Sequence, residues 1–406
     1  MSHSSRHAWQ IIKKLNPESQ TTKSAPLITP DDIAREIKQR GQHKPNYEFE
    51  KKIRREYQRT LSTIDDTGMF LSGSITHEEM KSAIKTMKNG KAAGIDGVYP
   101  EMITHLGPYA IEWLATAMTD IIEKGSYPTT WKHAKVVAIL KPGKPATDPS
   151  SYRPISLLCC LYKLLERIIL TRITPYVDKH IPPEQAGFRP QRGTAEQVLA
   201  LTTHIESGFE KKMKTGAVLI DLSAAYDTVW SGGLMLKLAK LIPSRKILKL
   251  LSQMTGTRQF QVTIGGENSK TRKIKNGVPQ GSVIAPTLFN VYISDMPKTE
   301  SLKFGYADDW ALTHQSERWE NIEQVLSQDT SALKSYFDKW YLKMNTTKSV
   351  STCFHLDNHQ ANRTLNVKIG ETTLPAERNP KYLGVTLDRQ LTYRNHLEGC
   401  VNYIAQ

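Results

Sequence analysis

The stretch Phe304-Gly-Tyr306-Ala-Asp308-Asp309-Trp310-Ala-Leu312 places two adjacent carboxylates between two short apolar runs. Apolar runs on either side of a turn are typical of a β-hairpin, so we expect strands over 303–306 and 310–313. Such a hairpin would hold Asp308 and Asp309 on a rigid sheet edge. An ordinary polar turn has the same pattern, so the meaning of the pair depends on its neighbours along the chain.

A third carboxylate follows another strand-like run earlier in the chain. Residues 217–220 are Ala-Val-Leu-Ile, and Asp221 comes directly after them. If this strand lies alongside the hairpin, Asp221 and Asp308 converge. Converging carboxylates suit Mg²⁺, which prefers oxygen ligands and shares its shell with water and substrate phosphates. The alternative for Asp221 is the N-cap of a short helix over 222–226.

The rest of the chain mixes helical and strand patterns irregularly. Helical periodicity and capping signals predict helices over 8–15, 45–60, 76–89, 109–124, 161–176, 195–211 and 321–344. Further strands are predicted over 135–140, 216–221 and 259–264. Because this order is not a regular β-α-β alternation, the sequence predicts an α+β fold rather than a doubly wound sheet.

Composition narrows the class of protein. The 406 residues carry 55 Lys and Arg against 40 Asp and Glu, a net charge of +15, which favours polyanionic partners such as nucleic acid. No apolar run reaches the ~18 residues of a membrane span, and the N-terminus lacks the apolar core of a signal peptide. The four cysteines have neither zinc-site nor disulfide spacing. We therefore expect free thiols in an intracellular protein without membrane partners; nucleus and cytoplasm are not distinguished.

Three segments together resemble the catalytic motifs of reverse transcriptases. Tyr306-Ala-Asp308-Asp309 is similar to their core motif, and Asp221-Leu-Ser-Ala-Ala-Tyr226-Asp227 to the motif that supplies the other catalytic carboxylate. Between them, Asn276-Gly-Val-Pro-Gln280-Gly281-Ser282 resembles the Pro-Gln-Gly motif beside the nucleotide site. The double aspartate alone is a weak signal, whereas ordered motifs are a strong one.

Flanking segments extend the resemblance from about residue 76 to 388. Two segments resemble motifs of the fingers: Ile139-Leu-Lys141-Pro-Gly143-Lys144 and Tyr152-Arg153-Pro-Ile-Ser156. Two are similar to motifs of the non-LTR retrotransposon branch: Lys91-Ala-Ala-Gly94-Ile-Asp96-Gly97 and Glu184-Gln185-Ala-Gly187-Phe188-Arg189. The later palm motif and the primer grip are resembled by Asn345-Thr-Thr-Lys348 and Tyr382-Leu-Gly384-Val385, respectively. Their order along the chain resembles that of jockey-like LINE elements.

The resemblance implies an RNA-directed DNA polymerase that adds dNTPs to a primer 3′-hydroxyl on an RNA template by two-metal phosphoryl transfer. Asp221, Asp308 and Asp309 would be the catalytic residues and the ligands of two Mg²⁺ ions. The residues implied to contact the nucleotide are Lys141, Arg153, Tyr226, Gln280, Gly281 and Lys348. The aromatic ring of Tyr226 would exclude a ribose 2′-hydroxyl. The implied primer grip is Tyr382, Leu383 and Gly384.

The implied architecture is a right-hand polymerase fold with fingers and palm and a truncated or vestigial thumb. We expect a basic N-terminal extension or linker over 1–75, fingers over 76–215, a palm over 216–388 and the start of the thumb over 389–406. The partners implied are an RNA template, a DNA primer, dNTPs and an endonuclease domain of the same polyprotein that is missing from this chain.

Two alternatives stay open. One is a catalytically inactive, nucleic-acid-binding fragment of a retroelement, which the expected truncation favours and the retained aspartates oppose. The other is an RNA-directed RNA polymerase, which shares the palm chemistry. Tyr226 and the Tyr-Ala-Asp-Asp sequence argue against it.

Overall fold

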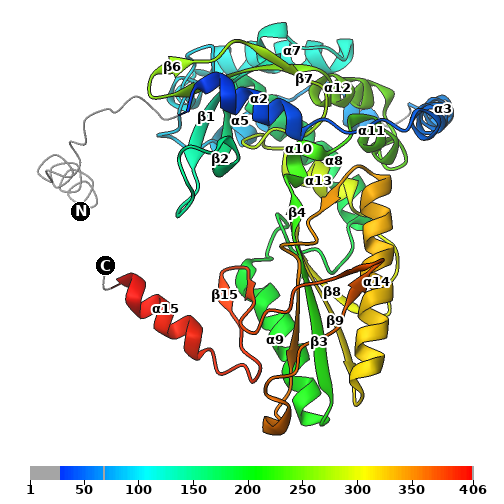
Figure 1. Ribbon diagram of the computed structural model, residues 1–406. Coiled ribbons are helices and arrows are strands. Elements are labelled where there is room, and N and C mark those ends of the chain that lie inside the picture. The colour runs from blue at the N-terminus through cyan, green and yellow to red at the C-terminus, as the bar shows by residue number, and fades with distance from the viewer. Residues whose placement is uncertain (1–27, 67–68, 405–406) are drawn as a thin grey trace, which may run out of the picture.

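The computed structural model describes residues 28–66 and 69–404, which form helices and two main β-sheets (Figure 1). One sheet and most of the helices occupy the upper part of the view. The second sheet lies below with a long helix on each side. The helix predicted over 8–15 lies outside the described residues. No helix in the described part of the chain is both long and apolar enough to cross a membrane.

The upper sheet has the strand order β2-β1-β5-β6, and β7 also pairs with β5. Its strands are β1 (His133–Leu140), β2 (Tyr152–Leu157), β5 (Arg258–Ile264), β6 (Glu267–Asn268) and β7 (Arg272–Ile274). The β1–β5 pair is parallel and the other pairs are antiparallel. Helix α2 (Pro30–Arg40) covers this sheet, because Ile33, Ala34 and Ile37 pack against Val136 and Phe260 in one apolar cluster.

The other helices of the upper part surround a larger apolar core. They are α3 (Tyr47–Thr63), α4 (Met69–Ser72), α5 (His77–Lys85), α6 (Pro100–Thr104), α7 (Pro108–Lys124), α8 (Cys160–Val177), α10 (Ala225–Thr228), α11 (Ser231–Ala239), α12 (Arg245–Thr255) and α13 (Ala285–Tyr292). Thr76 caps α5 by accepting a hydrogen bond from the Glu79 N–H. The Glu79 carboxylate does not reach back to complete a capping box with Thr76, because it pairs with the buried Arg172 of α8 at 2.7 Å.

The lower sheet is antiparallel, in the order β11-β3-β9-β8. Its strands are β3 (Lys214–Ile220), β8 (Leu302–Tyr306), β9 (Asp309–Ser316) and β11 (Val350–Phe354), and the helices beside it are α9 (Thr194–Glu210) and α14 (Trp319–Lys339). Successive side chains of β3 point to opposite faces of the sheet. Ala217 packs in the apolar cluster that contains Leu201 of α9, whereas Val218 packs in the cluster that contains Ile322 of α14. Both faces of the sheet are therefore buried.

Short elements complete the fold. They are β4 (Leu222–Ser223), β10 (Lys343–Met344), β12 (Lys368–Ile369), β13 (Thr372–Thr373), β14 (Lys381–Tyr382), β15 (Val385–Thr386) and α15 (Arg394–Ile404). The helix predicted over 321–344 was wrong at its C-terminal end: α14 stops at Lys339, and Tyr341 has a positive φ of 61°. The chain turns there because Met344 pairs with Leu222 in a small antiparallel ladder.

Candidate active site

Three aspartates meet where β3 ends and the β8–β9 hairpin turns. Ile220 pairs with Trp310 across β3 and β9, and Tyr306 pairs with Asp309 across the hairpin. Asp221 therefore leaves β3 directly beside the turn that contains Asp308. The two neighbouring strand ends predicted from sequence thus bring Asp221, Asp308 and Asp309 together.

These carboxylates repel one another and, among residues 28–66 and 69–404, take part in no ion pair. Burial, and then the charge of Asp221, raises the pKa of Asp308. Partial desolvation, and then the charges of Asp308 and Asp221, raises the pKa of Asp309 to about 6, although its side chain is largely exposed. A divalent cation would relieve this repulsion, and carboxylate oxygens are its preferred ligands.

Three carboxylates are chemically suited to bind a divalent metal, but their side chains do not form a metal-coordination shell. Within the described residues, no group of three or more His, Cys, Asp or Glu side chains is arranged to hold a metal ion. A bound metal would therefore need the Asp221, Asp308 and Asp309 side chains arranged around a common centre, an arrangement that the described residues do not show.

Backbone contacts fix the position of Asp221. Its N–H donates to the Ser349 hydroxyl at 3.1 Å, and its carbonyl accepts from the Asn345 N–H at 2.9 Å. The Asn345 side-chain oxygen also accepts from the Lys348 N–H, which closes a tight turn. This turn holds Lys348 at the edge of the same cleft as Asp221.

Gln185 supports the turn between β8 and β9. Its side-chain oxygen accepts hydrogen bonds from the N–H groups of Ala307 and Gly187, both at 2.8 Å, and its amide donates to the Ala307 carbonyl at 3.0 Å. Ala307 has a φ of 60°, which a residue with a β-carbon seldom adopts. Gln185 is 1% exposed. The sequence placed Gln185 in a motif but gave it no role; only the fold reveals it.

Tyr226 stands beside Asp308 with an unsatisfied hydroxyl. Its ring stacks on Phe289 at a centroid distance of 5.0 Å and meets Phe188 edge-on at 6.5 Å. The buried hydroxyl has no hydrogen-bond partner among the described residues. Burial, and then the charge of Asp308, raises the pKa of Tyr226. A rigid ring with an unpaired polar tip at the carboxylates is suited to contact a ligand there.

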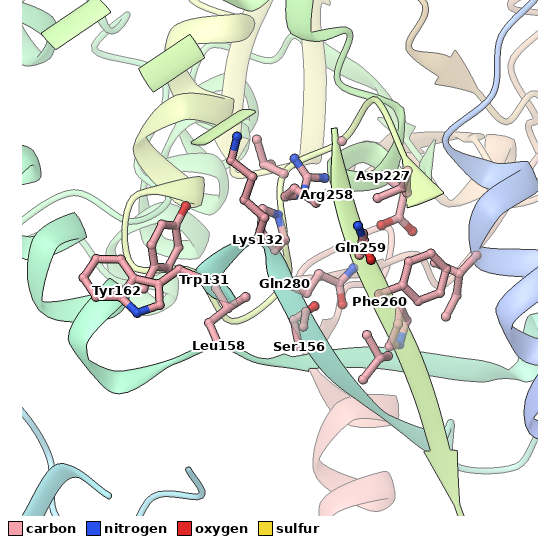
Figure 2. Close-up of a pocket in the computed structure, with 18 of the residues that line it drawn as sticks. Trp131, Lys132, Ser156, Leu158, Tyr162, Asp227, Arg258, Gln259, Phe260 and Gln280 are labelled. Atoms are coloured by element: carbon pink, nitrogen blue, oxygen red, sulfur yellow. The ribbon is translucent and has the colours of Figure 1, made fainter. Parts of the chain in front are cut away.

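Gln280 and Gly281 form a turn pressed against β2. The Gln280 carbonyl accepts from the Ser156 N–H at 2.8 Å. Gly281 has a φ of 116°, and a β-carbon there would lie 2.4 Å from the Ser156 carbonyl oxygen, so only glycine fits. Behind this turn is a cavity of about 50 Å³, shown in Figure 2, which Asp227 and Arg258 also line.

Basic side chains gather at the β1–β2 hairpin. Lys141 follows β1 and donates to the Ser150 carbonyl at 2.9 Å, and Arg153 is exposed on β2. Burial, followed by the charges of Arg40, Lys348, Arg153 and Lys144, lowers the pKa of Lys141. Arg153 and Lys348, which like Lys141 are predicted to contact the nucleotide, are thus close enough to Lys141 to repel its charge.

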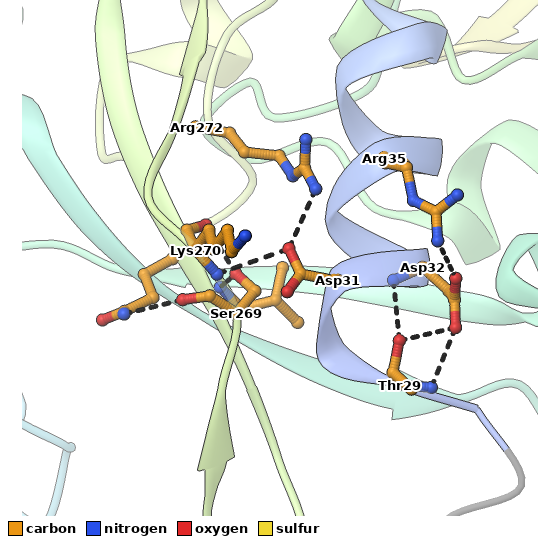
Figure 3. A network of polar contacts seen from close by, with 9 residues as sticks. Thr29, Asp31, Asp32, Arg35, Ser269, Lys270 and Arg272 are labelled. Atoms are coloured by element: carbon orange, nitrogen blue, oxygen red, sulfur yellow. Dashed lines mark hydrogen bonds and ion pairs between the residues drawn. The ribbon is translucent and has the colours of Figure 1, made fainter.

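Arg40 is the member of this basic group that the sequence missed. It ends α2, in the segment predicted to be an extension or linker, and pairs with Glu36 at 2.9 Å. Figure 3 shows how the start of α2 is fixed: Thr29 and Asp32 cap the helix, and Asp31 binds Arg272 of β7 at 2.8 Å. The apolar spacing of Ile33 and Ile37 was the only signal in the sequence that this helix is packed.

A cleft of about 490 Å³ joins the carboxylates to the predicted primer grip. Asp221, Asp309, Lys348 and the turn between β14 and β15 line it. Tyr382, Leu383 and Gly384 form that turn, with positive φ at Leu383 and Gly384. The Tyr382 hydroxyl donates to the Phe304 carbonyl at 3.1 Å, which fixes the turn on β8.

Comparison with known proteins agrees with this arrangement. Residues 139–387 match the family model for reverse transcriptase (RNA-dependent DNA polymerase). The chain is 36% identical over 357 residues to the probable RNA-directed DNA polymerase from transposon BS of Drosophila melanogaster, with 84% of this chain and 39% of the relative covered. It is 36% identical over 338 residues to the RNA-directed DNA polymerase from mobile element jockey of Drosophila funebris, with 80% and 36% covered.

A third relative is the probable RNA-directed DNA polymerase from transposon X-element of Drosophila melanogaster, 32% identical over 327 residues, with 79% of this chain and 36% of the relative covered. The chain thus spans less than two fifths of the length of these curated relatives. The family match covers more than half of the chain and includes all three aspartates and the Gln280 turn. The chain belongs to the reverse transcriptase (RNA-dependent DNA polymerase) family.

Proposed function

We propose that this chain is the polymerase of a non-LTR retrotransposon and adds dNTPs to a primer 3′-hydroxyl on an RNA template. The observation that carries the proposal is the convergence of Asp221, Asp308 and Asp309, which form no ion pair within the described residues, beside Tyr226. In this reaction the primer hydroxyl attacks the α-phosphate of the dNTP, and pyrophosphate leaves in line.

Asp221, Asp308 and Asp309 are the proposed ligands of two Mg²⁺ ions. When bound, such ions activate the attacking hydroxyl and stabilise the charge on the leaving phosphate oxygen. Burial, and then mutual repulsion, raises the pKa values of Asp308 and Asp309, and a bound cation would relieve the repulsion, which supports this assignment.

Lys141, Arg153 and Lys348 are the proposed contacts of the triphosphate. Their clustering supports this role: burial, and then the neighbouring positive charges, lowers the pKa of Lys141, and a polyanion would balance those charges. Arg153 offers two parallel donors to a phosphate, whereas each lysine acts as a point charge. We further propose that Gln280 and Gly281 shape the base side of the nucleotide pocket.

Tyr226 is the proposed sugar selector. Phe289 stacks on its ring, which favours a single position of the ring beside the carboxylates. A ribose 2′-hydroxyl would collide with the ring, which selects dNTPs over NTPs by exclusion.

The proposed domain boundaries are those expected from the sequence, with fingers over 76–215, a palm over 216–388 and the start of a thumb over 389–406. Tyr382, Leu383 and Gly384 are the proposed primer grip, since their turn lines the cleft that contains Asp221 and Asp309. The partners proposed are an RNA template, a DNA primer and further domains of a longer polyprotein, because the curated relatives are more than twice as long as this chain.

Primer extension on an RNA template tests the proposal. The wild-type chain should extend a DNA primer with dNTPs and Mg²⁺, and Asp308→Asn should reduce the rate at least a hundredfold while retaining the fold. Asp338→Asn, which changes an exposed aspartate on α14, is the matched control and should keep full activity. Equal activity of wild type and Asp308→Asn would refute the catalytic assignment. Binding of template–primer without extension would support an inactive fragment.

A further inference from the structure

Glu166 of α8 is a buried carboxylate that holds the end of the Gln280 turn. It is 1% exposed and accepts a hydrogen bond from the Ser282 hydroxyl and one from the Val283 N–H, the latter at 2.8 Å. The Ser282 oxygen in turn accepts from the N–H of Ala285, the first residue of α13. One carboxylate therefore fixes the segment that joins Gln280 and Gly281 to α13.

The Gln280 turn depends on this contact because its other side is poorly packed. Gly277 and Gln280 border the cavity of about 50 Å³ in Figure 2, so on that side the turn faces empty space. On the β2 side, the Gln280 carbonyl accepts from the Ser156 N–H, and Gly281 packs closely against the Ser156 carbonyl. The N–H groups of Gly277 and Val278 donate to backbone carbonyls before the turn and hold the start of the segment. Glu166 is the side chain that holds its other end, between Gly281 and α13.

We propose that Glu166 is a positioning residue that sets the Gln280 turn for nucleotide binding. The inference rests on the proposed polymerase function and extends it to a residue more than a hundred positions upstream of the turn. Glu166 acts through Ser282 and Val283, so it is not a catalytic residue.

The Glu166 carboxyl changes between its neutral and its charged form near neutral pH. Burial raises its pKa to about 7, and the Ser282 and Val283 hydrogen bonds oppose this. The charged and titratable groups that face it are Lys163 and Arg167 of α8, Arg258 of β5, and the phenols of Tyr127 and Tyr162. Above pH 7 the carboxylate accepts both hydrogen bonds strongly, whereas below pH 7 protonation weakens it as an acceptor. The KM for dNTP should therefore fall as the pH rises through 7.

Glu166→Gln tests the inference, because glutamine keeps the shape and loses the charge. We expect a roughly fivefold higher KM for dNTP, a kcat within twofold of wild type, and loss of the change in KM between pH 6 and 8. Ser282→Ala should raise KM similarly. The double variant should raise KM little further, because both substitutions act on the same Glu166–Ser282 hydrogen bond. Glu79→Gln is the matched control: its carboxylate also binds α8, through Arg172, but does not touch the turn.

A wild-type KM profile in Glu166→Gln, or the same change of KM in Glu79→Gln, would overturn the inference. Hydrogen exchange separates this failure from failure of the proposed function, because it needs no polymerase activity. The amides of Val283 and Ala285 should exchange at least tenfold faster in Glu166→Gln than in wild type, even if neither protein extends a primer. Unchanged exchange at both amides would also overturn the inference.

Discussion

Replacing Gln185 with methionine should dismantle the turn that carries Asp308. Methionine has nearly the same length and volume as glutamine, so the cavity term is small, but it makes none of the three hydrogen bonds of Gln185. Two buried backbone N–H groups, those of Ala307 and Gly187, then lose the one hydrogen-bond partner that each has among the described residues. Each such loss costs about 1–3 kcal/mol. We expect Gln185→Met to lower the free energy of unfolding by about 4 kcal/mol.

The activity should fall further than the stability alone would require. Ala307 has a positive φ, and once Gln185 no longer holds its N–H and carbonyl, the residue can relax to an ordinary conformation. That change moves Asp308, the next residue, away from Asp221. We therefore expect a loss of at least a hundredfold in the rate of primer extension at a temperature where the variant remains folded.

Urea unfolding followed by circular dichroism, with primer extension on the same samples, measures both effects. The matched control is Gln197→Met on α9, another buried glutamine, whose side chain donates to the Glu184 carbonyl and also lies within hydrogen-bond reach of Tyr382. It should lose about 1 kcal/mol for each contact and keep far more activity than Gln185→Met, because it does not touch Ala307 or Gly187. If Gln185→Met were as stable and as active as Gln197→Met, the role assigned to Gln185 would be wrong.

Three further predictions concern other parts of the molecule. Gly281→Ala should raise the KM for dNTP at least tenfold in primer-extension assays, because its β-carbon would collide with the Ser156 carbonyl and its φ is 116°; an unchanged KM would contradict this. Tyr226→Ala should lower the preference for dNTP over NTP at least tenfold in competition assays, and unchanged selectivity would remove it as the sugar selector. Burial lowers the pKa of Lys237 to about 8, below its unfolded value of 10.5. Between pH 8 and 10 the unfolded lysine therefore binds more protons than the folded one. In urea titrations, the free energy of unfolding of wild type should rise relative to that of Lys237→Met by at most about 1.4 kcal/mol per pH unit. A difference between the two free energies that stays constant with pH would refute this.

Much of the fold and the centre of the site could be predicted because their signals are local. The apolar runs before Asp221 and around Asp308 and Asp309 predicted the strands, and the structure pairs them as expected. The end of α14 could not be predicted in the same way. Met344 continues the apolar pattern of the helix, but its burial comes from pairing with Leu222, more than a hundred residues away.

The supporting residues of the site were hidden for the same reason. Gln185 acts on Ala307, Glu166 on Ser282, and Arg40 on Lys141, each across about a hundred residues of sequence. Glutamine, glutamate and arginine are common on helix and loop surfaces, so nothing local distinguishes these three. Their roles follow only from which segments the fold brings together.

The charges of the site indicate what kind of ligand completes it. Asp221, Asp308 and Asp309 form one set without ion pairs, and the cations around Lys141 form another, in which Arg40 pairs with Glu36. No ion pair in the described part of the chain joins the two sets, although Lys348 and Asp221 line the same cleft. Folding thus leaves repulsion within each set that direct pairing would have relieved, and such unrelieved charge is typical of functional sites. A ligand that carries cations to the aspartates and phosphates to the lysines relieves both at once, and a dNTP bound to Mg²⁺ has that distribution of charge.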